Sequence, residues 1–569
     1  MFKLRRFLKH YKKELILGPF FKLLEAIFEL AVPLVMAQII DKGIGNNDSD
    51  YVWKMSGLIV VLGICGLGFA LTCQFFAAKC AYGFGTELRD ALYKHINKFS
   101  HAEIDRFGTS SLITRITNDT VLAQNGVNMF IRLAVRAPFL IVGAAVMSMT
   151  LDLKLSIIFL IAAPIITLII VWVMKKTVPM YKKIQKGLDK ISLLTRENLD
   201  GVRVIRAFSK QEEEKKELIN ESGRLSDNAV IAGKISAILN PVTFMIMNLG
   251  IVAILWFGGI RVDTGYLTQG EITAFVNYMT QILLALVVLA NLVIIFTKAA
   301  SSASRINEVF DTQPSMTDGS DTKFDFSSPA VEFENVSFSY PDAGDLSLNN
   351  ISFTLKKGEI LGIIGGTGSG KSTLANLVPR FYDITSGNIK IFGKDIKKYS
   401  MEELRKLIGI VPQRAALFSG TIADNMRWGK PDATDQEIIS ALKIAQAWEF
   451  VSKLTDGIKT NISQGGKNLS GGQRQRLTIA RALVGNPPVV ILDDSMSALD
   501  YATDLALRKA IESELKDTDR IMISQRATTL QNADHILVLD NGEAAGYGIH
   551  ETLLKNCEEY AEIYKSQMS

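Results

Sequence analysis

Six long apolar segments, separated by polar stretches, fill the first half of the chain. Crossing the hydrocarbon core of a bilayer, ~30 Å thick, takes about 20 predominantly apolar residues in a helix. The segments that reach this length lie near Leu15 to Ile40, Met55 to Ala78, Ile131 to Leu151, Leu155 to Met174, Ile238 to Ile260, and Ile272 to Thr297. The pattern predicts an all-α domain with six membrane-spanning helices.

The polar connections differ in length on the two sides of the expected membrane. Asp41 to Trp53, Asp152 to Lys154 and Arg261 to Glu271 are short, whereas Thr86 to Asn128 and Thr177 to Lys234 are long and compatible with helix. A helix that continues ~25 residues past the bilayer projects about 40 Å from it. We therefore expect the helices to extend beyond the membrane on one side.

Basic residues indicate which side this is, because Lys and Arg are enriched in the cytoplasmic segments of membrane proteins. The residues that precede the first acidic residue, Glu14, include Lys3, Arg5, Arg6, Lys9, Lys12 and Lys13. An even number of spans returns the chain to the side on which it began. The sequence thus predicts a multi-pass protein of the cell membrane with both termini in the cytoplasm.

The composition changes after Arg305. The stretch that follows is polar and contains Thr312, Gln313, Pro314, Ser327, Ser328 and Pro329, and beyond it the chain has the composition of an ordinary globular domain. Polar, proline-containing segments commonly separate domains. We expect a transmembrane domain at residues 1–305, a linker at 306–328 and a soluble domain at 329–569.

The soluble part opens with a phosphate-binding pattern. The apolar run Ile360 to Ile364 is followed by Gly365, Gly366, Thr367, Gly368, Ser369, Gly370, Lys371, Ser372 and Thr373, and then by a helix-forming segment. A strand, a glycine-rich loop and a helix in this order form the phosphate loop of nucleotide-binding proteins. Its backbone amides point at the phosphates, Lys371 reaches the β and γ oxygens, and Ser372 ligates Mg²⁺. The pattern predicts an α/β P-loop domain.

Two further motifs belong to the same chemistry. A second apolar strand, Val489 to Leu492, ends in Asp493 and Asp494, and an aspartate at such a strand end anchors Mg²⁺, a role we assign to Asp493. Between the motifs, a helix-forming segment begins with Leu469, Ser470, Gly471, Gly472 and Gln473. A serine and two glycines at a helix start form a second cluster of amides for an anion. One nucleotide scarcely needs both clusters from the same domain.

With these motifs the chain resembles the half-transporters of the ATP-binding cassette (ABC) exporter family, over nearly its whole length. The resemblance implies six spans followed by one α/β P-loop ATP-binding cassette, and a second half-transporter as partner. The two cassettes of such a pair face each other head to tail. Each ATP, with its Mg²⁺, is then held between the phosphate loop of one chain and the signature segment, Leu469 to Gln473, of the other.

Other positions take their expected roles from this resemblance. Tyr340 resembles the aromatic residue that stacks on adenine, and Gln413 resembles the loop glutamine that senses Mg²⁺ and the membrane domain. Ser497 to Asp500 resembles the loop through which the cassettes touch. Asp119 to Asn125 and Gly201 to Ser209 resemble the coupling helices that dock on the cassettes.

The chain departs from the family pattern at its catalytic positions. Asp494 stands where the family usually has the glutamate that polarises the attacking water, Gln525 replaces the switch histidine, and Gln464 replaces a frequent glutamate before the signature segment. A misplacement of about 1 Å can cost on the order of 10²-fold in rate, and a neutral amide carries no positive charge. We expect a site that binds ATP and hydrolyses it poorly, within a heterodimer whose competent site the intact signature segment completes. A homodimer with near-normal turnover is the alternative.

Charge and cysteine content exclude other classes of protein. The net charge of the chain is +5, and 21% of its residues are charged against 48% hydrophobic ones. So weak a positive bias does not indicate a nucleic-acid partner. The four cysteines lack the spacing of zinc ligands or of a disulfide framework.

The first predicted span carries charged residues on one face. Lys22, Glu25 and Glu29 are spaced i, i+3 and i+7, and each intramembrane charge costs roughly 2.5 to 3.5 kcal/mol on insertion scales. Because Lys22 neutralises Glu25 only in part, we expect either a net negative wall suited to a cationic amphiphile or ion pairs with neighbouring spans. Polar amides in later spans either line the same cavity or bridge helices: Asn240, Asn248, Asn277, Gln281 and Asn291.

The function expected from these features is ATP-driven efflux of drugs or other amphiphilic compounds through the cell membrane. Two alternatives stay open at this point. One is a homodimeric lipid or drug exporter, and the other is a regulatory membrane subunit or channel gated by ATP.

Overall fold

The computed structural model describes residues 2–341, 343–497 and 499–568, and the chain divides into two compact units. The first unit holds the chain up to Asn97 together with Ser110–Thr312. The second unit holds Lys98–Thr109 together with the chain from Gln313 onward. A short piece of the membrane half of the sequence therefore belongs to the soluble unit.

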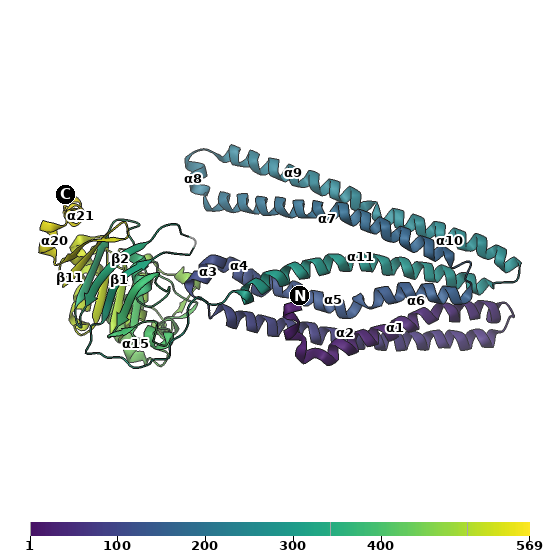
Figure 1. The fold of residues 1–569 in the computed structure, drawn as a ribbon, viewed down its shortest axis with the longest axis horizontal. Coiled ribbons are helices and arrows are strands. Elements are labelled where there is room, and N and C mark those ends of the chain that lie inside the picture. The colour runs from purple at the N-terminus through teal and green to yellow at the C-terminus, as the bar shows by residue number, and fades with distance from the viewer. Residues whose placement is uncertain (1, 342, 498, 569) are drawn as a thin grey trace. The chain divides into compact units, whose positions relative to one another are not determined.

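Long helices make up the described part of the first unit (Figure 1). Its elements are η1 (Phe2–Tyr11), α1 (Lys12–Gln38), η2 (Ile39–Ile44), α2 (Ser49–Ile96), α4 (Thr109–Thr114), η3 (Arg115–Asp119), α5 (Thr120–Met129), η4 (Phe130–Ala134), α6 (Arg136–Leu151), α7 (Ile157–Asp200), α8 (Val202–Ala207), α9 (Gln211–Ala237), α10 (Leu239–Asp263) and α11 (Gln269–Asp311). Six continuous helical stretches among the described residues are long and apolar enough to cross a membrane. The prediction of six spans is confirmed.

Several of these helices are much longer than a bilayer requires. α7 has 44 residues, which corresponds to about 66 Å at a rise of about 1.5 Å per residue, against a hydrocarbon core of ~30 Å. Figure 1 shows α7 and α9 side by side, joined by the short α8. The last helix, α11, continues to Asp311, into the range that composition predicts as linker. The helices therefore extend beyond the bilayer, as their polar ends indicate.

Small side chains and one buried tyrosine hold the helices of this unit together. Ala26, Ala144 and Ala274 are fully buried, and small residues allow helix backbones to approach closely in membrane domains. The Tyr278 hydroxyl, which is also buried, donates a hydrogen bond of 2.8 Å to the carbonyl oxygen of Leu30. This bond ties α11 to α1 across 248 positions of the chain.

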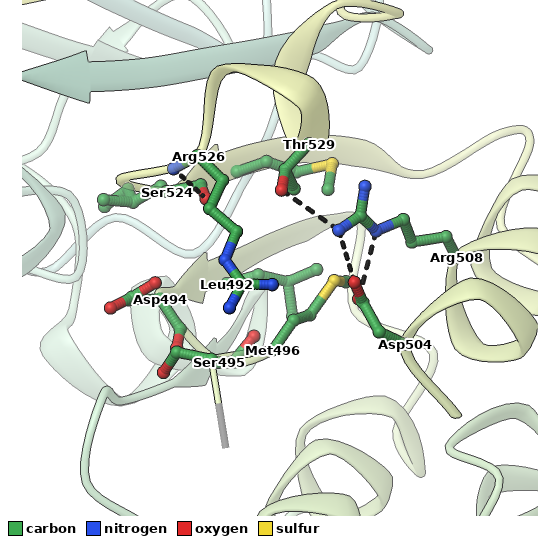
Figure 2. Close-up of a pocket in the computed structure, with 12 residues that line it drawn as sticks. Leu492, Asp494, Ser495, Met496, Asp504, Arg508, Ser524, Arg526 and Thr529 are labelled. Carbon is green, nitrogen blue, oxygen red and sulfur yellow. Dashed lines mark hydrogen bonds and ion pairs between the residues drawn. The ribbon is translucent and has the colours of Figure 1, made fainter. Parts of the chain in front are cut away.

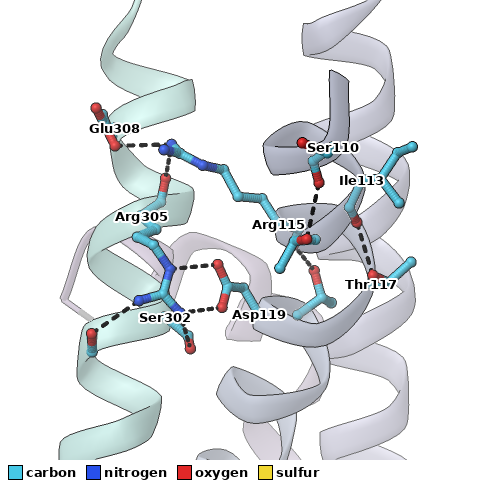
Figure 3. Close-up of polar contacts among 11 residues, drawn as sticks. Ser110, Ile113, Arg115, Thr117, Asp119, Ser302, Arg305 and Glu308 are labelled. Carbon is cyan, nitrogen blue, oxygen red and sulfur yellow. Dashed lines mark hydrogen bonds and ion pairs between the residues drawn. The ribbon is translucent and has the colours of Figure 1, made fainter. Parts of the chain in front are cut away.

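A second polar connection joins the segment Arg115–Asp119 to α11 (Figure 3). Asp119 is buried, and its carboxylate accepts hydrogen bonds from the Arg305 guanidinium. Arg115 donates to the Arg305 carbonyl oxygen at 2.8 Å and pairs with Glu308 at 2.9 Å. Two arginines and two carboxylates thus link elements that lie about 190 positions apart in the chain.

The soluble unit contains two main sheets. The four-stranded antiparallel sheet has the order β2 (Leu348–Leu355), β1 (Val331–Phe338), β4 (Ser386–Ile391) and β5 (Lys394–Asp395). The six-stranded sheet has the order β12 (Glu543–Gly548), β11 (His535–Asp540), β3 (Ile360–Gly365), β10 (Asp519–Ile523), β9 (Val489–Asp493) and β6 (Ile408–Val411). A short ladder joins β7 (Gly420–Thr421) to β8 (Asn461–Ile462). Five strands of the larger sheet, β11, β3, β10, β9 and β6, run parallel.

Helices accompany these sheets, which confirms the expected α/β domain. They are α3 (His101–Phe107), α12 (Lys371–Leu377), α13 (Met401–Lys406), α14 (Ile422–Met426), α15 (Asp435–Ile444), α16 (Trp448–Val451), η5 (Gly457–Lys459), η6 (Gln464–Gly466), α17 (Gly471–Leu483), α18 (Tyr501–Glu514), α19 (Ala527–Leu530), α20 (His550–Asn556) and α21 (Glu558–Met568). Central residues of the parallel strands, Ile363, Ile491 and Ile521, are fully buried. The carboxyl ends of β3, β9 and β10 meet at one edge of the sheet, where parallel α/β sheets bind ligands.

The segment of the membrane half that packs on the soluble unit is α3. The Tyr382 hydroxyl donates to the Asp105 carboxylate at 2.6 Å. The His101 ring stacks on Phe381 with 4.5 Å between ring centroids. Burial and the nearby Arg405 guanidinium lower the pKa of His101. The neutral ring thus suits this half-buried contact.

The expectation that Asp119 to Asn125 docks on the cassette is wrong. Asp119 belongs to the first unit, where its buried carboxylate is paired with Arg305. The part of the connection Thr86 to Asn128 that packs on the soluble unit is instead the earlier helix α3. The other expected coupling segment, Gly201 to Ser209, contains α8, which has no buried residue, and its role stays a prediction.

Substitutions at the Asp119–Arg305 pair test its contribution to the first unit. Arg305→Gln leaves a carboxylate buried without its cation, and we expect a loss of about 2 kcal/mol of stability because removing one partner of a buried pair is strongly destabilising. Asp119→Asn should lower the stability less than Arg305→Gln does. The double substitution should lower it by less than the sum of the two single losses, with a coupling energy of about 1 to 3 kcal/mol. Unfolding of the purified chain in detergent measures these differences.

Lys3→Gln is the matched control, since it breaks the exposed Lys3–Asp311 pair on the same helix α11. Exposed pairs contribute at most about 1 kcal/mol. Additive effects of the two Asp119 and Arg305 changes would contradict the coupling.

Candidate nucleotide-binding site

A cleft of about 650 Å³ in the soluble unit collects most of the residues that the sequence motifs indicate. The predicted residues that line it are Tyr340, Thr367, Gly368, Gly370, Lys371, Ser372, Thr373, Gln413, Asp493, Asp494 and Gln525. They come from five separate stretches of sequence. The structure therefore brings together the phosphate loop, both aspartates, the loop glutamine and the switch position.

The phosphate loop connects β3 to α12 through backbone that favours glycine. Gly368 and Gly370 have φ values of +84° and +98°, in the left-handed region that side chains with a Cβ avoid. A Cβ at Gly370 would also lie 2.7 Å from Leu348. Gly368 and Gly370 are thus required by the turn itself.

Lys371 is held over this loop. Its ammonium donates to the carbonyl oxygens of Gly365 at 2.9 Å and Gly366 at 2.5 Å, and to the Ser369 hydroxyl at 3.3 Å. Burial lowers its pKa, while the charges of Asp493 and Asp494 act in the opposite direction. The cation therefore lies beside the two carboxylates, at the place where a phosphate chain would meet the loop.

Asp493 and Ser372 place two hard oxygen ligands together. Asp493 is only 8% exposed. Burial raises its pKa, and a hydrogen bond with Ser372 partly offsets this. A buried carboxylate with a raised pKa gains from a nearby cation. The described residues hold no group of three or more His, Cys, Asp or Glu side chains suited to a metal, but Mg²⁺ at phosphate sites needs only one or two carboxylates. The donor set fits Mg²⁺.

Asp494 lies on strained backbone at the end of β9. Its φ is +44°, and its amide donates to the Ile523 carbonyl oxygen at 3.0 Å. Burial raises the pKa of its carboxyl, while hydrogen bonding to Gln413 opposes the rise. The carboxylate thus has a partner, Gln413, that also lines the cleft.

Tyr340 is fixed by its neighbours. Its hydroxyl lies 3.1 Å from the Thr373 hydroxyl, and its ring packs edge-on against Tyr382 and Phe338, with centroids at 5.2 and 4.9 Å. The half-buried ring therefore forms part of the cleft wall next to the phosphate loop.

The signature segment lies outside this cleft. The Ser470 hydroxyl accepts a hydrogen bond from the Gln473 amide at 3.2 Å, and the Gln473 side chain accepts one from the Ser470 amide at 2.9 Å. This capping box begins α17, with Ser470 and Gly471 exposed. A Cβ built on Gly471 would meet no atom within 4 Å. None of Ser470, Gly471, Gly472 and Gln473 lines the cleft.

The loop Ser497 to Asp500 follows shortly after Asp494 in the chain. The Ser497 hydroxyl donates to the Asp494 carbonyl oxygen at 2.8 Å. Asp500 caps α18 by accepting from the Thr503 amide at 3.1 Å. Ala498, part of the same motif, lies outside the described residues.

Sequence reasoning missed several residues that hold the switch segment. Figure 2 shows Arg526 in the same small cavity as Asp494, and Arg508 joined to Asp504 and Thr529. The Arg508 guanidinium donates to Thr529 at 3.0 Å, which ties α18 to α19. Gln567 of α21 donates to the Gln525 carbonyl oxygen at 2.7 Å. Of these residues, only Arg526 could have been indicated by the sequence, because it directly follows Gln525 in the switch segment.

The charges of the first span are paired within the membrane unit. Lys22 contacts both Glu25 carboxylate oxygens at 2.7 and 2.6 Å. Glu29 pairs with Arg136 of α6 at 2.6 Å. Of the two alternatives, ion pairing with a neighbouring span is confirmed and the net negative wall is wrong, because Arg136 neutralises the remaining carboxylate. The charge argument for a cationic substrate therefore loses its basis. Arg136 was missed although it lies inside the predicted span Ile131 to Leu151.

Comparison with known proteins gives matches over both halves. The family model for the ABC transporter transmembrane region matches residues 15–287, and the ABC transporter family model matches residues 348–497. The uncharacterized ABC transporter ATP-binding protein YfiB of Bacillus subtilis is 39% identical over 567 residues, covering 100% of this chain and 98% of the relative.

Two other relatives carry more descriptive names. The ATP-dependent lipid A-core flippase of Haemophilus influenzae is 32% identical, with 99% of this chain and 96% of the relative covered. A solved structure of a bacterial Atm1-family ABC exporter with ATP bound has 25% sequence identity and a TM-score of 0.80, covering 100% of this chain and 99% of that one. The likeness therefore extends over the entire chain.

The Glu29–Arg136 pair can be tested by removing its charges singly and together. Glu29→Gln leaves Arg136 without its carboxylate, and we expect a loss of about 1 to 3 kcal/mol, since an unpaired intramembrane charge is costly. The double variant, Glu29→Gln with Arg136→Gln, should regain most of the stability that Glu29→Gln loses. Melting curves of the purified variants measure the effect. Weaker transport of cationic dyes alone, with unchanged stability, would contradict the pairing role.

Proposed function

The chain belongs to the ABC transporter family, and we propose that its own phosphate loop binds ATP but hydrolyses it slowly, within a heterodimeric exporter. The comparisons and the fold identify the chain as an ATP-driven ABC exporter subunit, an ATPase coupled to transport. It has six candidate spans and one cassette. A half-transporter of this kind works with a dimer partner.

One observation carries the proposal. The cleft that contains the phosphate loop has Asp494 and Gln525 at its catalytic positions, whereas the exposed signature segment lies elsewhere on the unit. The weakened groups and the intact ones therefore serve different nucleotides. In a complex with a half-transporter that has a competent cleft, this separation would give two unequal sites.

Binding of ATP is assigned to groups that the cleft supplies. The loop amides and the Lys371 ammonium would hold the β and γ phosphates, and the half-buried Tyr340 ring would stack on the adenine, as the family resemblance implies. Ser372, Gln413 and Asp493 would hold Mg²⁺, which neutralises phosphate charge. Fixed donors around a phosphate chain stabilise developing charge without reorganisation.

Slow hydrolysis follows from two side chains. The Asp494 carboxylate is one methylene shorter than a glutamate and is hydrogen-bonded to Gln413, so it is poorly placed to orient a water. Gln525 can donate a hydrogen bond to the γ phosphate, but it cannot supply the charge of an imidazolium. Orientation of the attacking water and stabilisation of the γ phosphate are therefore both weakened in this cleft.

The signature segment is assigned to the partner's nucleotide. Exposed amides at the start of α17 can close over an ATP held by another cassette, whose hydrolysis would reset the transporter. We assign both termini and the cassette to the cytoplasmic side of the cell membrane, because the N-terminal segment is basic.

The substrate class that we propose is a drug-like or lipid-like amphiphile. The name of the flippase relative supports a lipid-like compound. A homodimeric exporter is the alternative that the next two experiments separate from the heterodimer. The other alternative, an ATP-gated regulatory subunit, would be supported by a substrate gradient that dissipates through the complex without ATP turnover.

The first experiment compares ATP turnover by the chain alone and by its complex with the half-transporter encoded nearest to it. We expect the chain alone to bind ATP and to hydrolyse it at least about 10-fold more slowly than the complex. Asp494→Glu with Gln525→His should raise turnover of the chain alone. Equal rates for the chain and the complex would show that the heterodimer is not required.

The second experiment assigns the two halves of the site within the complex. Gly471→Ala should nearly abolish turnover, because its methyl group meets nothing in this chain but lies where the partner's nucleotide would bind. Lys371→Ala should slow turnover less than the same change in the partner.

Gly223→Ala serves as the control, since this helical glycine also has open space around it. If the two lysine changes cause equal losses, the assignment of roles is wrong.

A further inference from the structure

The C-terminal helix α21 holds the backbone of the switch segment through one side chain. The amide nitrogen of Gln567 donates to the Gln525 carbonyl oxygen at 2.7 Å, and its Oε1 accepts from the Ala527 amide at 2.8 Å. These two groups belong to consecutive peptide bonds, on either side of Arg526. A single side-chain amide near the end of the chain therefore fixes both peptide groups that follow the switch position.

The bond to Ala527 also satisfies the start of α19. The first amides of a helix have no acceptor within the helix, and the N-cap residue of α19, Arg526, makes no side-chain cap. Ala527 is fully buried, and a buried amide without an acceptor is costly. Gln567 therefore supplies, from another helix, the acceptor that keeps the beginning of α19 in place.

α21 is itself docked on the core of the soluble unit. Tyr560 is fully buried and belongs to one apolar cluster with Ile364 of β3 and with Ala527 and Leu530 of α19. Its hydroxyl lies 2.7 Å from His550 Nδ1. The last residues of a domain are usually loose unless they are tied down. Here they are tied both to the strand that leads into the phosphate loop and to the helix that follows the switch segment.

The residue at the switch position makes this support important. Gln525 lines the cleft together with Lys371 and Asp494. A charged imidazolium attracts a phosphate from a range of positions, whereas a neutral amide acts only through a short and well-directed hydrogen bond. The direction of the Gln525 side chain follows from the backbone that carries it. A switch glutamine therefore depends on a fixed backbone more than a switch histidine does.

We propose that Gln567 is a positioning residue, which holds the Gln525 amide toward the γ phosphate of the nucleotide in this cleft. The inference rests on the proposed function, in which the cleft binds ATP and Gln525 meets the γ phosphate. Gln567 is not among the residues that line the cleft, so it acts through the backbone of the switch segment. Because ADP has no γ phosphate, the contribution of Gln567 is specific to the triphosphate.

Equilibrium binding to the purified full chain in detergent, with Mg²⁺ present, tests this role. The probes are tritiated ADP and tritiated adenylyl imidodiphosphate, an ATP analogue that has a γ phosphate and is not hydrolysed. Gln567→Met keeps the length of the side chain and removes its donor and its acceptor. We expect it to weaken binding of the analogue about 5-fold, the size of one hydrogen bond, and to leave ADP binding unchanged. Equal losses for the two nucleotides would overturn the positioning role.

A double substitution separates positioning from a general effect on the fold. Gln525→Ala should weaken binding of the analogue about as much as Gln567→Met does. Adding Gln567→Met to Gln525→Ala should then weaken it no further, because both changes remove the same contact. Additive losses would show that Gln567 does not act through Gln525.

Gln531→Met is the matched control, because this glutamine directly follows α19 and donates to the Thr528 carbonyl oxygen of its own turn at 3.2 Å. It should leave both affinities unchanged. If Gln567→Met lowers the melting temperature, Gln567→Glu gives a second test, since it keeps the acceptor for Ala527 and removes the donor to Gln525. It should again weaken binding of the analogue alone, and an unchanged affinity would contradict the proposal.

Failure of the proposed function would give a different result. If the unsubstituted chain binds neither nucleotide, the cleft is not an ATP site, and the positioning role falls with it. If the chain binds both nucleotides and Gln567→Met changes neither affinity, only the positioning role is wrong. Turnover is not measured, so the result does not depend on the heterodimer.

Discussion

The nucleotide site depends on the register of three parallel strands. In the larger sheet Ile523 of β10 lies opposite both Ile363 of β3 and Asp493 of β9. β9 and β10 therefore end at the same level, and β3 continues two residues further, to Gly365, on the same edge of the sheet. A shift of one residue would turn every side chain to the other face and would separate Asp493 from Ser372. The buried branched side chains of these strands maintain the register, so the hydrophobic core of the sheet determines where the chemistry lies.

The same geometry separates the two anion-binding segments of the cassette, so that one nucleotide does not contact both of them. The phosphate loop leaves the central strand β3, whereas α17 begins at an exposed position outside the cleft. Asp494 and Gln525 line the cleft, whereas Ser470 and Gly471 lie outside it. The departures from the family pattern at these two positions therefore leave the amides of the signature segment unchanged, and the core that builds the fold is not involved.

In the membrane unit, several charged residues meet a partner that lies far away in the sequence. Glu29 meets Arg136, Asp152 meets Arg261, and Asp119 meets Arg305. Of these, Glu29 and Arg136 lie within predicted spans, where an unpaired charge would oppose insertion. These pairs link α1 to α6, the turn after α6 to α10, and the segment before α5 to α11.

Sequence alone determined the features that depend on neighbouring residues. Six apolar runs of membrane length, the order of strand, glycine loop and helix around Lys371, and the identities of Asp494 and Gln525 are local properties, and the fold agrees with them. Only the tertiary structure decided which distant groups meet. It placed α3 rather than Asp119 to Asn125 on the soluble unit, paired Glu29 with Arg136, and left the signature segment outside the cleft. These contacts depend on how helices rotate and pack against one another, which hydrophobic length and periodicity do not specify.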